Sequence, residues 1–184
     1  FKAISSDFLF SVENGKQVNG LKGEYFDNIK LEGKPKVTRT DKQIKFGWTL
    51  FSPHPDIPYG WYSARWTGKL KSPVSGTVNI GIEGNDGYRL YINEKLLIDN
   101  WQKKSFNTIV KEYVFEKEQE YDIRLEFFEP VGNVKLALVW DAEVENNWKQ
   151  QIKDAVEAAL KSDVAVIVAG IEEVVNYYET HGVK

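Results

Sequence analysis

The stretch SGTVNIGIEGNDGYRLYI, residues 75–92, decides the fold because it joins two strand patterns through a turn. Apolar and polar side chains alternate over residues 75–83, which is typical of a strand with one buried face. The turn at Gly84-Asn-Asp-Gly87 follows, and glycine and asparagine tolerate the positive φ angles that tight turns require. Tyr88 to Ile92 then begins a hairpin that returns through Leu96 to Ile98. These patterns predict antiparallel strands.

Similar strand patterns recur on both sides of this stretch. They lie at Leu21–Phe26, Trp61–Thr67, Ile109–Phe115, Tyr121–Glu129 and Asn133–Trp140. Many short alternating strands separated by turns favour a sandwich or a barrel. We therefore expect a mainly β chain, with an antiparallel β-sandwich or barrel from about Leu21 to Asp141.

After Asp141 the periodicity of the sequence changes. Apolar residues from Trp148 to Leu160 fall at helical spacing, with Asn146 or Asn147 as the cap. Val164 to Ile171 is a continuous apolar run, as in strands buried on both faces of a parallel sheet. One helix and one strand cannot complete such a sheet. We predict a short α/β appendage that belongs to a larger domain or docks elsewhere. The predicted division is a lead-in segment 1–19, a β domain 20–142 and a partial α/β segment 143–184.

Composition and charge argue against several classes of partner and cofactor. The net charge is −3 and the lysines are scattered, so no basic stripe indicates nucleic-acid binding. No run of ~18 apolar residues indicates a membrane span. The chain has no cysteine, and His54 and His181 lie far apart, so we expect neither a zinc site nor a cofactor. The absence of methionine suggests a piece of a longer chain.

Aromatic residues are abundant, at 14% of the chain with six tryptophans and nine tyrosines. Two interpretations stay open. Some rings could lie on the surface, where flat rings often contact carbohydrate or protein. Alternatively, the β core is simply rich in aromatic residues.

The segment from Trp48 to Trp61 is the predicted ligand-binding loop. Three prolines should restrict its conformations. Phe51, His54 and Tyr59 lie in the middle of the loop and are the better contact candidates, since rings can stack on a sugar and His54 can hydrogen-bond a hydroxyl. Trp48 and Trp61 are also candidates, but residues at strand ends are often part of the core.

Carboxylates offer weaker signals. Asp86 in the Asn-Asp-Gly turn is a candidate sugar-binding residue, or it only closes the turn. One carboxylate and one amide supply too few oxygens for tight calcium binding, so we expect no metal there. Glu172 and Glu173 follow the apolar run, but adjacent residues of an extended chain point apart. They cannot be the two carboxyl groups that glycoside cleavage needs. No catalytic residue is predicted.

Five ordered segments resemble the PA14 domain. They are GLKGEYF at Gly20–Phe26, FGW at Phe46–Trp48, SARWTG at Ser63–Gly68, GNDGYRLYIN at Gly84–Asn93 and LIDNW at Leu97–Trp101. Yeast adhesins of this family bind sugars through a calcium ion held by two adjacent aspartates, and only Asn85-Asp86 resembles that pair here. The resemblance implies a secreted, periplasmic or surface-bound protein.

A second resemblance involves AVEAALKSDVAVIVAG, residues 155–170, which is similar to the α/β sandwich domain of glycoside hydrolase family 3. Several β-glucosidases of that family carry an inserted PA14 domain that narrows the substrate pocket. The catalytic glutamate motif expected after this strand is absent from EEVVNYYETHG, residues 172–182. The implied function is a non-catalytic accessory domain, inactive alone, whose partners are carbohydrate and the other domains of a β-glucosidase. The alternatives are an autonomous lectin-like module and a purely structural one.

Overall fold

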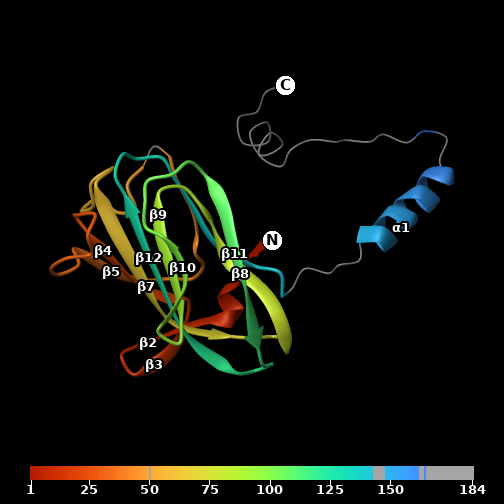
Figure 1. The fold of residues 1–184 in the computed structure, drawn as a ribbon, viewed down its shortest axis with the longest axis horizontal. Helices are drawn as coiled ribbons and strands as arrows, with labels where there is room; N and C mark the ends of the chain where they lie inside the picture. The colour runs from red at the N-terminus through yellow and green to blue at the C-terminus, as the bar shows by residue number, and fades with distance from the viewer. Residues whose placement is uncertain (50, 143–147, 162–163, 165–184) are drawn as a thin grey trace. The chain divides into compact units, whose positions relative to one another are not determined.

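The computed structural model describes residues 1–49, 51–142, 148–161 and 164 (Figure 1). The chain divides into two compact units, Phe1–Val144 and Glu145–Lys184. The described part of the first unit consists of two antiparallel sheets and a short 3-10 helix η1 (Ser6–Phe8). In the second unit, the helix α1 (Trp148–Leu160) confirms the predicted helical periodicity. Among the described residues, no helix combines the length and hydropathy needed to cross a membrane.

The smaller sheet has five strands and is built around two long neighbours, β13 and β8. Its strands are β1 (Lys2–Ala3), β6 (Lys45–Trp48), β8 (Gly76–Gly84), β11 (Asn107–Phe115) and β13 (Val134–Trp140). One edge of β13 pairs with β8, and the other edge is shared by β1 and β6. β11 pairs with the free edge of β8 over nine residues.

The larger sheet has eight strands and is built around β7 and β12. Its strands are β2 (Leu9–Glu13), β3 (Lys16–Asn19), β4 (Leu21–Phe26), β5 (Val37–Asp41), β7 (Tyr62–Lys71), β9 (Gly87–Ile92), β10 (Lys95–Asn100) and β12 (Glu120–Glu129). One edge of β7 pairs with β12 over ten residues. The other edge is divided, because β4 pairs with residues 63–67 and β2 with residues 69–70.

The two sheets bury the side chains that the alternating patterns predict. On β8, β12 and β13 the inward positions are at most 4% exposed, and they are Val78, Ile80, Ile82, Tyr121, Ile123, Leu125, Phe127, Val134, Leu136, Leu138 and Trp140. Burial of this apolar surface is the main stabilising contribution to the fold. The mainly β antiparallel fold is therefore confirmed.

The sheets extend further toward the N-terminus than the predicted first strand at Leu21. Lys2 pairs with Trp140, and Leu9 pairs with Leu70. Ile4 and Leu9 are fully buried, so this segment contributes apolar surface to the same core. Of the predicted apolar strand 164–171, only Val164 lies within the described residues, so that prediction stays untested.

Candidate functional site

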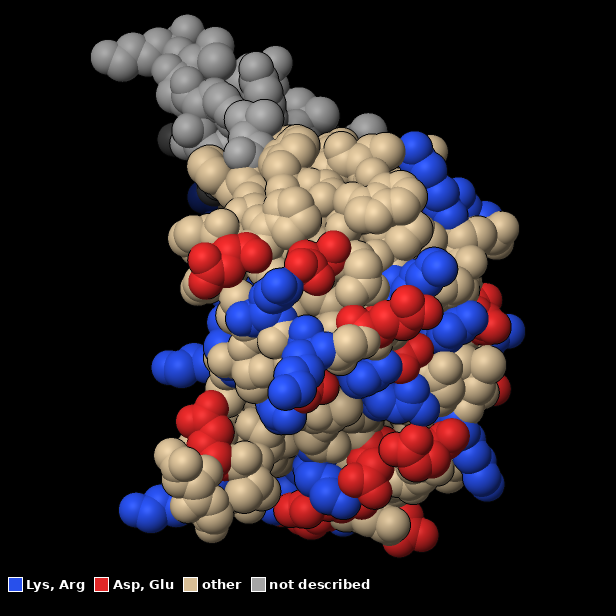
Figure 2. Space-filling view, turned by 90° about the vertical axis from the view of Figure 1, so that its left-hand side faces the viewer, with Lys and Arg blue, Asp and Glu red and all other residues tan. Residues whose placement is uncertain are grey.

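Four connections meet at one end of the first unit, which we call the loop end. They are the β6–β7 loop (49–61), the β8–β9 turn (85–86), the β10–β11 loop (101–106) and the β12–β13 loop (130–133). The backbone N–H of Asp86 donates to the carbonyl of Lys104 over 2.8 Å, and Asn85 Nδ2 donates to the carbonyl of Asn133 over 2.8 Å. The turn at 85–86 therefore joins two of the other loops. Figure 2 shows an area without Lys, Arg, Asp or Glu at the upper end of the molecule.

The β6–β7 loop is held to the core at two points. Arg39 donates from Nη1 to the carbonyl of Pro53 over 2.9 Å, and Ile57 is 3% exposed. Near the ends of the loop, the hydroxyl of Tyr59 donates to the carbonyl of Thr49 over 2.7 Å. These contacts, together with the prolines, restrict the conformations of the described part of the loop.

Arg39, which holds the loop at Pro53, belongs to a buried polar network. Asp41 accepts hydrogen bonds from Tyr25 over 2.5 Å, from Trp66 Nε1 over 2.8 Å and from Arg39 Nε over 2.8 Å. Burial raises the pKa of the Tyr25 phenol, and the Asp41 charge raises it further, so the phenol stays protonated and donates. Since Arg39 bonds both Asp41 and Pro53, this network positions the loop.

His54 stabilises a turn inside the loop. Its Nδ1 accepts from the backbone N–H of Asp56 over 3.1 Å, and its carbonyl accepts from the N–H of Ile57 over 2.9 Å and from Ser52 Oγ over 2.7 Å. One ring nitrogen of His54 is therefore already engaged, and only Nε2 remains for a ligand. The predicted contact residue also has a structural role.

Three aromatic rings of the loop are exposed to solvent. Phe51 is 69% exposed, Tyr59 46% and Trp61 58%. The ring of Tyr59 lies over Gly132, where an added Cβ would come within 2.2 Å of the ring. Trp61 has a left-handed φ of 65° immediately before β7 begins at Tyr62, and its indole is exposed. A left-handed conformation is uncommon for a bulky residue and is often found where function requires it.

Trp48 differs from these three rings. It is half-buried and stacks on Phe46 with the ring centroids 4.3 Å apart. It also makes edge-to-face contacts with Tyr25 and Tyr62, with ring centroids 6.2 and 6.4 Å apart. Of the two tryptophans that flank the loop, Trp48 belongs to the core packing and Trp61 to the surface.

Asp86 lies beneath the loop end and is only 3% exposed. Its carboxylate accepts from Asn85 Nδ2 over 2.7 Å and faces the carboxyl group of Glu129. Glu129 accepts through Oε1 from the backbone N–H groups of Val131 and Gly132 over 2.7 and 2.6 Å. This placement favours a role for Asp86 in holding the loops rather than in direct contact with a sugar.

The two carboxyl groups share a buried environment. Burial raises the pKa of Glu129 to about 7, and the charge of Asp86 raises it as well, although the N–H groups of Val131 and Gly132 oppose this change. Burial also raises the pKa of Asp86. Glu129 Oε2 is buried and has no hydrogen-bond partner in the described part of the chain. A proton on Oε2 would satisfy both acids by bridging them.

The structure thus leaves Phe51, Tyr59 and Trp61 exposed on one loop and buries Asp86. Sequence reasoning missed Glu129. A signal for it was present, because Glu129 continues the inward phase of Tyr121 to Phe127 and so falls at a buried position. Within the described ranges, no group of three or more His, Cys, Asp or Glu side chains could hold a metal ion.

The fold and this site define a class of two-sheet antiparallel β domains that present loops at one end. Residues 17–158 match the PA14 domain, and the chain belongs to the PA14 family. The comparisons confirm the predicted family resemblance for the β domain. They do not bear on the predicted likeness of the C-terminal segment to a glycoside hydrolase domain.

Several proteins are similar to this chain in sequence. The anti-sigma-I factor RsgI3 of Acetivibrio thermocellus is 32% identical over 133 residues, which are 72% of this chain and 20% of that protein. A xylan 1,4-beta-xylosidase of Xylanibacter ruminicola is 28% identical over 114 residues, which are 59% and 13% of the two chains. This chain therefore spans a fifth or less of the length of these relatives.

Solved structures share the fold. An anti-sigma factor domain-containing protein from Clostridium clariflavum matches 68% of this chain and 42% of its own, with a TM-score of 0.63 and 38% identity. A beta-glucosidase from Kluyveromyces marxianus matches 88% of this chain and 21% of its own, with a TM-score of 0.64 and 17% identity. A PA14 sugar-binding domain from an RTX adhesin matches 67% of this chain and 89% of its own, with a TM-score of 0.55 and 15% identity.

Proposed function

We propose that this chain is a non-catalytic carbohydrate-binding module of a larger protein, with its binding surface at the loop end. The observation that carries the proposal is the set of three exposed rings, Phe51, Tyr59 and Trp61, on a loop held by Arg39 and Ile57. Apolar ring faces accept the C–H groups of a sugar ring, and neighbouring polar groups fix its orientation.

The anchoring of the loop favours binding. Because Pro53 and Ile57 are already held in place, a ligand has less ordering entropy to offset. The polar groups at hand are Nε2 of His54 and the exposed backbone of the loop. The PA14 domain of the RTX adhesin is a sugar-binding domain, which supports the same class of ligand here.

The test is a glycan array followed by titration of the 184-residue chain with the best neutral oligosaccharide. Trp61→Ala and Tyr59→Ala should each weaken binding about 10-fold or more, because aromatic anchors contribute most of such contact energies. Phe1→Ala is the matched control, since Phe1 is also an exposed ring, at 57%, and lies outside the four loops. Equal losses in the control variant, or no binding to any glycan, would contradict the proposal.

A more specific candidate function is an accessory role in a family 3 β-glucosidase-like enzyme. The observation that favours it is the coverage of the beta-glucosidase structure, which matches 88% of this chain against 67% for the RTX adhesin domain. At 17% identity this likeness concerns the fold alone. The anti-sigma factor relatives favour a different kind of parent protein. The identity of the full-length protein that contains this chain therefore determines whether the accessory role applies.

An assay of the parent protein separates them. In a glycosidase parent, replacing Phe51, His54 or Tyr59 with alanine should change the preference between disaccharides and longer oligosaccharides. Hydrolysis of a small aryl β-glucoside should stay nearly unchanged, because catalytic carboxylates would lie in other domains. A parent without hydrolytic activity would exclude the accessory role and leave the carbohydrate-binding proposal standing.

A further inference from the structure

A groove of about 380 Å³ lies on the outer face of the eight-stranded sheet. Strands β7 and β12 form its floor and contribute Thr67 and Asp122. The β2–β3 hairpin forms one wall, which includes Val12, and Glu94 at the β9–β10 turn contributes to the opposite side. None of its lining residues belongs to the four loops of the loop end, so it is a separate feature of the surface.

The groove forms because β2 separates from β7 at Gly68. β2 pairs with β7 only at Leu9 and Phe10, and β4 occupies the same edge of β7 beyond that point. Gly68 lies between the two pairings, where an added Cβ would come within 2.2 Å of the carbonyl oxygen of Phe10. The hairpin therefore departs from β7, and a hydrogen bond between Thr40 and Glu13 ties it to β5.

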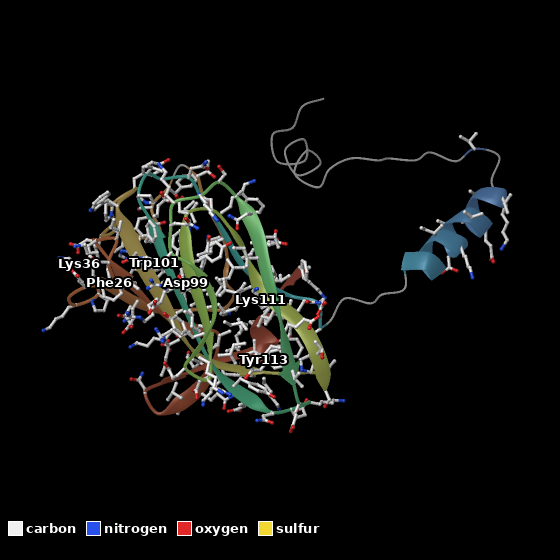
Figure 3. The ribbon with its side chains drawn as sticks, in the orientation of Figure 1. Phe26, Lys36, Asp99, Trp101, Lys111 and Tyr113 are labelled. Atoms are coloured by element: carbon white, nitrogen blue, oxygen red, sulfur yellow. The ribbon has the colours of Figure 1, made fainter. Side chains whose placement is uncertain are left out.

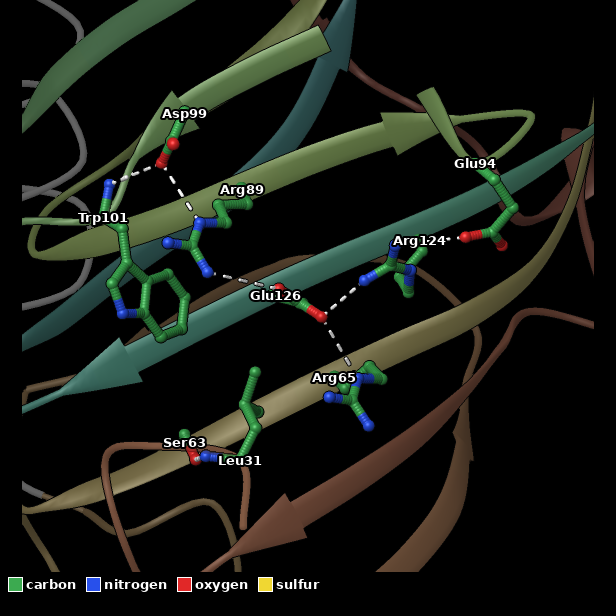
Figure 4. Close-up of polar contacts among 9 residues, drawn as sticks. All are labelled: Leu31, Ser63, Arg65, Arg89, Glu94, Asp99, Trp101, Arg124 and Glu126. Atoms are coloured by element: carbon green, nitrogen blue, oxygen red, sulfur yellow. Dashed lines mark hydrogen bonds and ion pairs between the residues drawn. The ribbon is translucent and has the colours of Figure 1, made fainter. Parts of the chain in front are cut away.

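Paired charges of both signs line the groove. Lys69 Nζ lies 2.7 Å from Asp122 Oδ1, and Arg124 Nη2 lies 3.1 Å from Glu94 Oε2 (Figure 4). Three cationic and three anionic residues line it in all, so the groove has no net formal charge. An anionic or cationic ligand would meet as many like charges as opposite ones. A neutral ligand that both donates and accepts hydrogen bonds would suit these pairs.

The lining also includes one buried polar side chain and one exposed apolar side chain. Ser11 is 6% exposed, and its Oγ has no hydrogen-bond partner within the described ranges. Val12 is 70% exposed and offers an apolar surface on the hairpin wall. Ligand sites commonly combine an apolar lining with a few polar groups in volumes of roughly 300–1,000 Å³. The volume of the groove lies at the lower end of that range and fits a mono- or disaccharide.

We propose that this groove is a second binding site, which takes a neutral mono- or disaccharide unit independently of the loop end. The Lys69–Asp122 pair presents a donor and an acceptor side by side, as two adjacent sugar hydroxyls require. Val12 and the outer face of Thr67 contact the C–H surfaces of the sugar. The site would let one module hold a polysaccharide at two places.

The experiment is a titration of the 15N-labelled 184-residue chain with cellobiose, xylobiose and lactose, followed by backbone amide NMR. At least one of these sugars should shift the amides of Thr67–Lys69 and Asp122–Arg124 in a saturable way, with a Kd on the order of 1 mM. A variant that combines Lys69→Met with Asp122→Asn should weaken this binding about 10-fold or more. The matched control combines Lys71→Met with Glu118→Gln, which removes an ion pair of 2.6 Å outside the groove.

Each outcome decides the proposal. Shifts confined to the loop end would overturn the groove site while supporting the proposed function, and shifts confined to the groove would do the reverse. Saturable binding of digalacturonate in place of the neutral sugars would show that the inferred ligand class is wrong. Equal weakening in the control variant would also overturn it. If the groove variant fails to fold, the positions of the shifted amides in the wild-type chain alone decide whether the groove binds sugar.

Discussion

The loop end and the outer face of the eight-stranded sheet differ in whether their surface rings are covered by arginine side chains. On the sheet face arginines lie over rings, with Arg124 3.6 Å from the centroid of Tyr91 and Arg65 5.9 Å from that of Phe26. Where β10 runs into the loop end, Arg89 lies 4.5 Å from the ring centroid of Trp101, which Figure 3 labels together with Asp99. At the loop end, Arg39 lies beneath the loop, and the rings of Phe51, Tyr59 and Trp61 project outward. Aromatic content alone therefore does not make a stacking surface, because cation–π contacts already occupy rings on the sheet face.

The carboxylates at the centres of the two regions also differ. Asp41 accepts three hydrogen bonds from side chains, one of them from the fully buried Trp66. Glu126 lies between Arg65 at 3.3 Å and Arg124 at 2.6 Å, and both arginine side chains are at least 24% exposed (Figure 4). Loss of Asp41 would leave buried donors without an acceptor. Loss of Glu126 costs less, because water can reach its arginine partners.

The largest effect is expected for Asp41→Ala. This change leaves Trp66 Nε1 and the Tyr25 hydroxyl without their acceptor and removes the carboxylate partner of Arg39. Breaking a buried pair in this way should lower the free energy of unfolding by about 3 kcal/mol. Urea denaturation followed by tryptophan fluorescence measures it. A loss no greater than that of Glu126→Gln would remove the distinction between the two regions.

A smaller effect is expected from the pH dependence of the Asp86–Glu129 pair. The pKa of Glu129 is about 7 in the folded chain, against an ordinary value of 4.5 for the carboxyl in the unfolded chain. The folded state therefore binds the proton more tightly. Its contribution to stability is full below pH 4.5 and is lost as the pH rises through about 7. The free energy of unfolding should fall by on the order of 2 kcal/mol between pH 5 and 8.

The control for this prediction is Glu129→Gln. Glutamine keeps an acceptor for the N–H groups of Val131 and Gly132 and can donate permanently to Asp86, with no proton to lose. Urea midpoints of this variant should be much less sensitive to pH over the same range. Lys103, which lowers the pKa of Asp86, and the buried Tyr62 are the other titratable groups that act on the pair. Parallel pH profiles of the wild type and the variant would show that the pair holds no shared proton.

The smallest effect is expected for Glu126→Gln, at about 1 kcal/mol in the free energy of unfolding. Glutamine keeps one acceptor for Arg124, and the partly exposed arginines regain water. Lys69→Met is the matched comparison, because Lys69 and Asp122 are 45% and 57% exposed and such pairs contribute about 0–1 kcal/mol. A loss near 3 kcal/mol for Glu126→Gln would mean that the sheet face depends on its charges as strongly as the loop end does.

Much of the β domain was predictable because strand patterns are local. The alternation at Val78, Ile80 and Ile82 fixed which face is buried, and the turn at residues 84–87 needed only Gly and Asn chemistry. The segment before Leu21 was harder, since β1 is two residues long and takes its stability from pairing with the distant β13.

By itself the sequence determined the antiparallel class, the strand phases, the prolines of the β6–β7 loop and the rings it carries. It also held the inward phase of Glu129, although that signal was overlooked. The tertiary structure alone decided that Trp48 is packed and Trp61 exposed, that Arg39 reaches Pro53, and that a groove opens where β2 leaves β7 at Gly68. The physical reason is that exposure and hydrogen-bond partners depend on residues far apart in the chain, which no local pattern records.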